Sequence, residues 1–279
     1  MKTLKNLVTL ILFLSVITLN AQNLAFEVQV IGKGKPVLLF PGFTCTGEVW
    51  DLIVEEISKT HQCHVFTFAG FGEIPAIEKP WLPKIKESVV QYISDQQLEK
   101  PTLIGHSLGG TLALWMASEN DAYEQLIVVD ALPSTGALMM PNFNSELMVY
   151  DNPYNTQLLA MDTTSFEQMA AQMAQGMTLN TSKRAVLKNW IVQADRATYV
   201  YGYTDLLKLD LRDAVKHIKA RVTILGATAP YGLETVKKTF QEQYVHLEDY
   251  TIKFADASAH FIMFDQPEWL LNEIKLVLD

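Results

Sequence analysis

The sequence predicts an α/β fold in which a mostly parallel central sheet carries helices on both faces. Short apolar runs, typical of strands buried on both faces, recur along the chain at residues 37–40, 65–68, 102–104, 126–129, 221–226 and 250–254. Helix-compatible segments separate these runs, and strands that alternate with helices indicate parallel pairing. The 279 residues, 49% of them hydrophobic, suffice for one large α/β domain or two small ones.

The first strand of this series is different in pattern. Residues 24–31 alternate apolar and polar side chains, as a half-buried antiparallel strand at the sheet edge does. The later runs are joined by helix-compatible segments, which we expect at residues 47–59, 81–97, 111–118, 233–243 and 269–278. The final segment closes the chain as a helix.

One region interrupts the alternation of strands and helices. Residues 133–208 contain no strand pattern, so we expect a helical cap there, between two parts of the core at 22–132 and 209–279. Seven of the ten methionines fall in this region: Met139, Met140, Met148, Met161, Met169, Met173 and Met177. Flexible thioethers are also ordinary core fillers, but their clustering here favours an adaptable apolar substrate pocket.

The N-terminus predicts export. Lys2 and Lys5 precede an apolar run at 7–19, and small and polar residues follow, so residues 1–21 have the layout of a secretory signal peptide. The run is too short to span a membrane comfortably. We therefore expect a secreted or periplasmic protein with no stable membrane span.

The charge of the chain argues against nucleic-acid partners. The formal net charge is −9, and removal of residues 1–21 makes the chain more acidic because this segment contains two lysines and no acidic residue. A chain without a block of lysine or arginine is a poor binder of nucleic acid. The partner that the sequence predicts is a small-molecule substrate, and nothing in the sequence specifies an oligomeric state.

The two cysteines, Cys45 and Cys63, are predicted to remain unpaired even in an oxidising compartment. Cys45 follows the end of one predicted strand and Cys63 lies near the start of the next, which places them at opposite ends of the sheet, beyond the reach of a disulfide. The stretch His61–His64 contains two histidines, but no further acid or cysteine cluster supports a metal site. We interpret it as the start of a strand.

The stretch Gly105-His106-Ser107-Leu108-Gly109 predicts a catalytic nucleophile. It follows a short apolar strand and opens a helix, which is the order of a nucleophile elbow. Glycines are needed there because the chain turns sharply and side chains beside the serine would collide with backbone. A glycine-rich turn without catalytic function is the alternative interpretation.

A serine hydroxyl is a weak nucleophile and needs a base. His260 offers one, because it follows the last predicted strand in a loop of small residues and so lies at the same sheet edge as the elbow. With these motifs the chain resembles the α/β-hydrolase superfamily over nearly all of residues 24–279. The resemblance is carried by Pro41-Gly42-Phe43, Gly105–Gly109, Asp210–Asp213, Ala259-His260-Phe261 and Gln266-Pro267-Glu268.

This resemblance implies roles for four of the matching residues. Ser107 would be the nucleophile and His260 the general base and acid. The backbone N–H groups of Phe43 and Leu108 would form the oxyanion hole. No metal or organic cofactor is implied.

The acid of the triad departs from the family pattern. The loop 226–234, where relatives usually carry an aspartate, has no acid near the expected position. Some members take the acid from the end of the strand after the elbow helix, and here Asp130 ends that strand. We therefore predict Asp130, with Glu234 and Asp256 as the alternatives.

The function expected from these residues is that of a serine hydrolase cleaving esters of small to medium apolar compounds through an acyl-enzyme on Ser107. The same triad would serve an amidase, an aminopeptidase-like enzyme or an acyltransferase. A non-catalytic ligand-binding protein on a hydrolase scaffold is the alternative from a different class.

Overall fold

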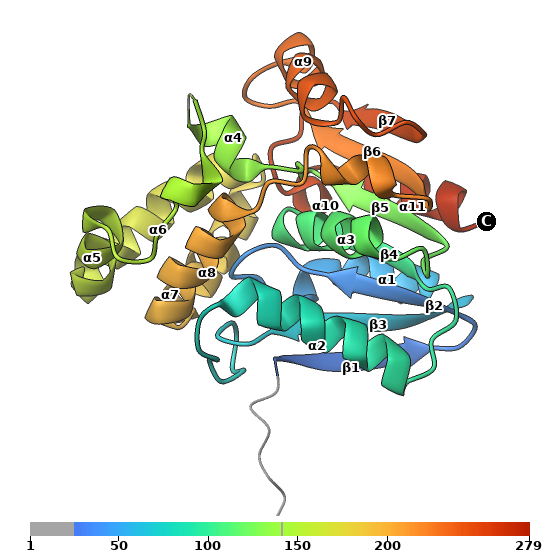
Figure 1. Cartoon of the computed structure of the whole chain (residues 1–279), viewed down its shortest axis with the longest axis horizontal. Helices are drawn as coiled ribbons and strands as arrows, with labels where there is room; N and C mark the ends of the chain where they lie inside the picture. Colours follow the sequence, from blue (N-terminus) through green and yellow to red (C-terminus); the bar gives the residue numbers. More distant parts are fainter. Residues whose placement is uncertain (1–24, 141) are drawn as a thin grey trace, which may run out of the picture.

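The protein is built around a seven-stranded sheet with helices on both faces (Figure 1). The computed structural model describes residues 25–140 and 142–279. The strand order is β1-β3-β2-β4-β5-β6-β7, and only β1 is antiparallel to its neighbour. The strands are β1 (Phe26–Gly32), β2 (Lys35–Phe40), β3 (His61–Phe68), β4 (Thr102–His106), β5 (Gln125–Val129), β6 (Arg221–Ala227) and β7 (Tyr250–Ala255). The predicted α/β fold and its antiparallel edge strand are confirmed.

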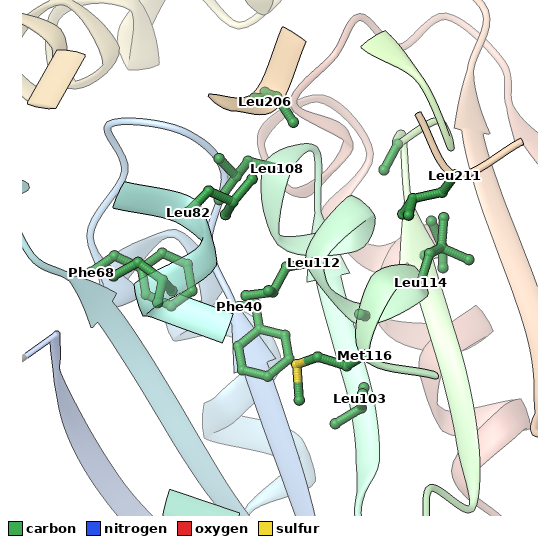
Figure 2. Close-up of a cluster of buried hydrophobic side chains, with 14 of the residues drawn as sticks. Phe40, Phe68, Leu82, Leu103, Leu108, Leu112, Leu114, Met116, Leu206 and Leu211 are labelled. Atoms are coloured by element: carbon green, nitrogen blue, oxygen red, sulfur yellow. The ribbon is translucent and has the colours of Figure 1, made fainter. Parts of the chain in front are cut away.

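The central strands bury alternate side chains against opposite helical layers, as the pleat of a strand requires. In β2, Leu38 and Phe40 join the cluster under α2 (Trp81–Asp95) and α3 (Leu108–Glu119), part of which is drawn in Figure 2. Val37 and Leu39 join the cluster under α1 (Asp51–Ile57) and α11 (Pro267–Leu278). Because both faces are covered, β2 is apolar from Val37 to Phe40.

Among the elements that begin earlier than the sequence pattern predicts, α3 and β3 differ most. Helix α3 starts at Leu108 rather than at residue 111, and its first turn includes Gly109 and Gly110. These glycines fit there because they have no side chains to collide with the backbone of Phe40 and the side chain of Ala131. Strand β3 starts at His61 rather than at residue 65. Its polar start pairs with the end of β1, where Gly32 lies opposite Gln62. The interpretation of His61–His64 as the start of a strand is confirmed.

Between β5 and β6 the described residues form helices and no strand. These are α4 (Thr135–Met139), α5 (Pro153–Ala160), α6 (Thr163–Met177), α7 (Arg184–Gln193) and α8 (Arg196–Lys208), with 3-10 turns at Ser145–Leu147 and Thr181–Lys183 and, after α8, at Ala214–His217. In Figure 1 these helices project from one end of the sheet. A helical cap over the core therefore agrees with the structure, and its limits at 133 and 208 stay a prediction.

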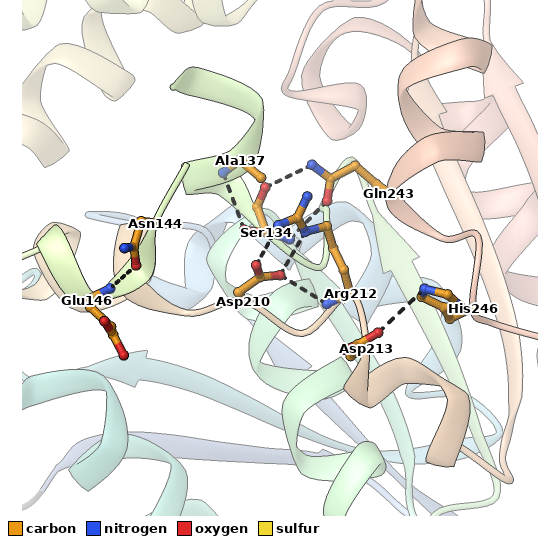
Figure 3. Close-up of polar contacts among 9 residues, drawn as sticks. All are labelled: Ser134, Ala137, Asn144, Glu146, Asp210, Arg212, Asp213, Gln243 and His246. Carbon is orange, nitrogen blue, oxygen red and sulfur yellow. Dashed lines mark hydrogen bonds and ion pairs between the residues drawn. The ribbon is translucent and has the colours of Figure 1, made fainter. Parts of the chain in front are cut away.

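The chain enters and leaves the cap at adjacent positions (Figure 3). The Leu211 N–H donates to the Pro133 carbonyl at 3.0 Å. The side chain of Gln243, from α9 (Leu233–Gln243), donates to the Ser134 carbonyl and accepts from the Ser134 N–H. The pKa of Asp210 is lowered mainly by its hydrogen bond from Arg212. The two segments that connect the cap to the core are thus bonded to each other, and the first of them is also bonded to α9.

Both cysteine thiols are free and buried. Cys45 lies after the end of β2 and Cys63 lies near the start of β3, and burial raises the pKa of the Cys63 thiol to about 11. Within the described ranges no helix combines the length and the apolar character needed to cross a bilayer. The predicted signal peptide, residues 1–21, lies outside the described residues.

Candidate active site

Ser107 stands at the sharp turn between β4 and α3. Its backbone has φ 52° and ψ −120°, a conformation that few residues other than glycine adopt. Two hydrogen bonds hold the turn: the Ser107 N–H donates to the Val129 carbonyl at 2.9 Å, and the Ser107 carbonyl accepts from the Thr111 N–H at 3.0 Å. The Ser107 side chain does not cap the helix. The elbow therefore presents a hydroxyl that the local fold does not use.

Glycines make this turn possible by close approach of backbone to backbone. A Cβ atom on Gly105 would lie 2.2 Å from the Gly109 carbonyl oxygen, and one on Gly109 would lie 2.4 Å from the Phe40 carbonyl oxygen. Real Cβ atoms do not come so close to backbone. The elbow thus admits no side chain at either position.

The structure brings His260 and Asp130 together across 130 residues of sequence. His260 Nδ1 lies 2.6 Å from Asp130 Oδ2. The other carboxylate oxygen accepts from the Ala227 N–H at 2.8 Å, which fixes the plane of the carboxylate. Because an ionised carboxylate only accepts, Nδ1 carries the proton and Nε2 is left with its lone pair. That is the tautomer a general base requires.

The two alternative acids lie elsewhere. Glu234 is on the first turn of α9, its side chain is 89% exposed, and it pairs with Lys237 at 3.4 Å. Asp256 is exposed and accepts from the N–H of Ala257. Neither carboxylate contacts His260 within the described residues. Of the three acids that the sequence offered, Asp130 alone is placed to orient this histidine.

The predicted oxyanion donors flank the elbow. Leu108 is the first residue of α3, so its N–H has no partner within the helix and lies at the positive end of the helix dipole. No residue of the described ranges accepts a hydrogen bond from the Phe43 N–H. The Phe43 ring packs edge-on against Phe71 and Trp81, which holds its loop in place. Both amides are therefore free to donate to a ligand.

His106, between the glycines of the motif, positions the loop of His260. Its Nε2 lies 2.9 Å from the His260 carbonyl oxygen, so Nε2 must be the protonated nitrogen. The ring is fully buried, and its Nδ1 has no hydrogen-bond partner among the described residues. Burial, and secondarily the charge of a protonated His260, hold the pKa of His106 well below its usual range. His106 therefore stays neutral at neutral pH.

The buried, neutral state of His106 predicts an acid-dependent loss of stability. In the unfolded chain this histidine binds a proton near pH 6.5, whereas in the folded chain it does not, so unfolding is favoured as pH falls. The unfolding free energy of the wild type should fall from pH 7.5 to pH 5.5. In His106→Gln we expect this fall to be smaller by about 1.4 kcal/mol. Denaturant titrations at both pH values measure this difference. His217→Gln, at an exposed histidine, is the control, and equal losses in wild type and His106→Gln would contradict the assignment.

The loop that carries His260 is bonded to the cap. The Phe261 N–H donates to the Met177 carbonyl, the last residue of α6, at 3.0 Å. Asp265 accepts from the N–H of Ala259 at 2.8 Å on one side. On the other side it accepts from the N–H groups of Leu179 and Asn180, both at 3.0 Å. One carboxylate thus joins the base loop to the end of α6, a role that no motif in the sequence indicated.

Ser107, His260 and Asp130 line one cavity of about 1370 Å³, together with Phe43. The other walls come from the cap helices and from α9, and they include six of the seven clustered methionines: Met139, Met140, Met148, Met169, Met173 and Met177. Met161 packs against the core cluster instead. The arrangement places a nucleophile, an oriented base and an apolar binding volume in one place, which is what acyl transfer requires.

Comparison with known proteins finds sequences similar to this one along most of the chain. Residues 37–273 match the family model described as "Alpha/beta hydrolase family". A pimeloyl-[acyl-carrier protein] methyl ester esterase of Vibrio cholerae is 24% identical over 258 residues, which cover 90% of this chain and 97% of that protein. A 3-oxoadipate enol-lactonase of Acinetobacter baylyi is 22% identical over 263 residues, covering 91% and 93%.

Solved structures share the architecture. The enol-lactonase of Burkholderia xenovorans LB400 superposes with a TM-score of 0.76 at 13% identity, covering 91% of this chain and 96% of that one. An esterase from Exiguobacterium antarcticum gives a TM-score of 0.73 at 16% identity, with 90% and 94% covered. At these identities the likeness shows the fold.

Proposed function

The chain belongs to the alpha/beta hydrolase family, and from that membership we propose that it is an exported carboxylic ester hydrolase acting through an acyl-enzyme on Ser107. The observation that carries the proposal is the 2.6 Å contact between His260 Nδ1 and Asp130, made in the cavity that Ser107 also lines. Esterases and a lactonase among the similar proteins support ester cleavage. The signal-peptide pattern of residues 1–21 supports export.

In the proposed reaction, His260 Nε2 takes the proton of the Ser107 hydroxyl as its oxygen attacks the ester carbonyl. Asp130 holds the imidazole in the productive tautomer and stabilises the imidazolium that forms. The N–H groups of Leu108 and Phe43 donate to the oxygen that becomes negative, and each such donor lowers the barrier by about 2.7–4 kcal/mol. His260 then protonates the leaving alcohol. In the second half of the reaction water attacks the acyl group with His260 again as general base, and His260 returns the proton to Ser107 as the carboxylic acid leaves.

The apolar walls of the cavity support substrates of small to medium size with little polarity. An amide has a poorer leaving group than an ester, and the described residues of the cavity include no acid other than Asp130 that would bind the free amino group of a peptide. Ester hydrolysis is therefore the activity we favour over an amidase or aminopeptidase-like one.

The test combines turnover with labelling of the nucleophile. Wild-type protein should hydrolyse short-chain p-nitrophenyl esters and should be labelled by a fluorophosphonate probe on the peptide that contains Ser107. Ser107→Ala should lose both signals, whereas Ser94→Ala, at an exposed serine of α2, should keep them. A wild type that neither turns over esters nor takes the label would leave a binding protein on a hydrolase scaffold as the remaining explanation.

A further inference from the structure

We infer that the ester is uncharged and carries an apolar chain of medium length, which lies along one face of helix α6. The inference rests on the proposed function and specifies its substrate class. It excludes esters that carry a second, free carboxylate. Three features of the described cavity lead to it: the charge of its walls, the run of methionines that begins beside His260, and the partners of two tyrosines.

The described residues of the cavity wall offer no lysine or arginine to an anionic substrate. Among the described lining residues there is no lysine, arginine or glutamate, and the ionisable residues other than tyrosine are Asp130, His260 and the buried His106. Asp130 is already engaged by His260. A substrate carboxylate would therefore lose its hydration inside the cavity without gaining a charged partner, which is strongly unfavourable.

A continuous methionine surface leads away from the catalytic base. Met169, Met173 and Met177 are spaced by four residues, so they share one face of α6, and all three line the cavity. The Met177 carbonyl bonds to the Phe261 N–H, so this face begins beside His260. From Met177 to Met169 the helix advances about 12 Å. Because three bonds of an extended chain advance about 3.5 Å, this surface matches a chain of roughly ten bonds.

Helix α8 supplies a facing wall with neutral donors. Tyr199 and Tyr203 are four residues apart and both line the cavity. Their hydroxyls contact thioethers: Tyr199 lies 3.5 Å from the Met173 sulfur, and Tyr203 lies 3.2 Å from the Met139 sulfur. Burial raises the pKa of Tyr203, so its phenol stays protonated. Thioether acceptors are weak, so these hydroxyls are available to donate to an uncharged oxygen of the substrate, but as neutral donors they supply no positive charge to balance a carboxylate.

A matched set of substrates tests the charge directly in the wild type. The set is p-nitrophenyl octanoate, the mono-p-nitrophenyl ester of suberic acid and its methyl-capped diester, which have closely similar lengths. We expect kcat/KM for the two neutral esters to exceed that for the carboxylate by at least about 100-fold, because the anion is desolvated without a partner. We also expect octanoate to exceed acetate by about 10-fold or more, since each buried methylene favours binding.

The alcohol side is tested by the pair octyl acetate and 8-acetoxyoctanoate. If kcat/KM for the anionic ester equals that for its neutral counterpart on the acyl side or on the alcohol side, the inference is wrong. This outcome is distinct from failure of the proposed function, in which none of the esters is hydrolysed and Ser107 takes no label.

Variants on α6 locate the preference. Met173→Arg places a cation in the wall, and we expect the ratio of kcat/KM for neutral over anionic ester to fall by at least about 10-fold. Gln172→Arg adds the same charge at an exposed position outside the lining and should leave the ratio unchanged. Met173→Leu should also keep it. Equal ratios in Met173→Arg and Gln172→Arg would show that this face does not bind the chain.

Discussion

Asp130→Asn is expected to lower kcat for ester hydrolysis by roughly 10⁴-fold while changing KM little. The asparagine can still accept from the Ala227 N–H, so the loop keeps its geometry. Its amide group, however, donates to the His260 Nδ1 where the carboxylate accepted. The imidazole is then held in the tautomer whose Nε2 is protonated, and it can neither take the proton of Ser107 nor gain charge beside a compensating acid.

The two remaining acids provide matched controls for this result. Glu234→Gln and Asp256→Asn make the same chemical change at exposed carboxylates that do not contact His260. Both should retain kcat within about two-fold, because exposed substitutions away from the site have small effects. Steady-state kinetics on a single p-nitrophenyl ester compares the three variants. A large loss in either control, with Asp130→Asn active, would reassign the acid.

Gly105→Ala is expected to destabilise the fold by about 3–5 kcal/mol or to prevent folding. The added methyl group would lie 2.2 Å from the Gly109 carbonyl oxygen, and the closest atoms are backbone atoms that cannot rotate away. Relief requires either β4 or the first turn of α3 to shift, and both belong to the buried core. Chemical denaturation followed by circular dichroism measures the loss.

Gly176→Ala provides the opposite case. Gly176 lies in the last turn of α6, and a Cβ atom there meets nothing within 4 Å. The substitution should be neutral or stabilise by up to about 1 kcal/mol, since alanine restricts the unfolded chain and favours helix. Similar unfolding free energies for Gly105→Ala and Gly176→Ala would contradict the close approach at the elbow.

The sheet could be predicted from the sequence because its strands are buried on both faces. Runs such as Leu126–Val129 are apolar at every position, and the glycines and acids that follow them mark the strand ends. Where the observed boundaries differ from the predicted ones, the cause is a contact with a residue that is remote in the sequence. His61 begins β3 because it pairs with Lys35 of β2, and Gly109 can lie in the first turn of α3 because it has no side chain to collide with the Phe40 carbonyl oxygen.

The site was predictable to the extent that it is encoded by local motifs. The elbow and the His260 loop each have a short signature, and the sheet edge brings them together. The acid has no such signature, because its identity depends on which of three carboxylates the fold brings to His260 Nδ1. The structure places Asp130 there, and its catalytic role stays a prediction that the variants above test.

Two residues at the site were not assigned a role from the sequence. Asp265 acts through backbone N–H groups of Ala259, Leu179 and Asn180, and backbone partners leave no trace in a side-chain pattern. His106 lines the cavity, and its bond to the His260 carbonyl depends on a contact across 154 residues of sequence. Both roles become visible only when the loops are placed in space.

The bonds that join Asp265 and Phe261 to the end of α6 have a consequence for building chimaeras of this protein. The His260 loop and residues 177–180 are bonded to each other and move as one unit, although Leu179 and Asp265 are 86 residues apart in the sequence. A cap transplanted from a relative with junctions at the entry and exit crossings alone would sever this unit and release the base. Grafts that carry residues 259–266 together with α6 should retain the alignment of His260, so a functional exchange of substrate range requires two segments rather than one.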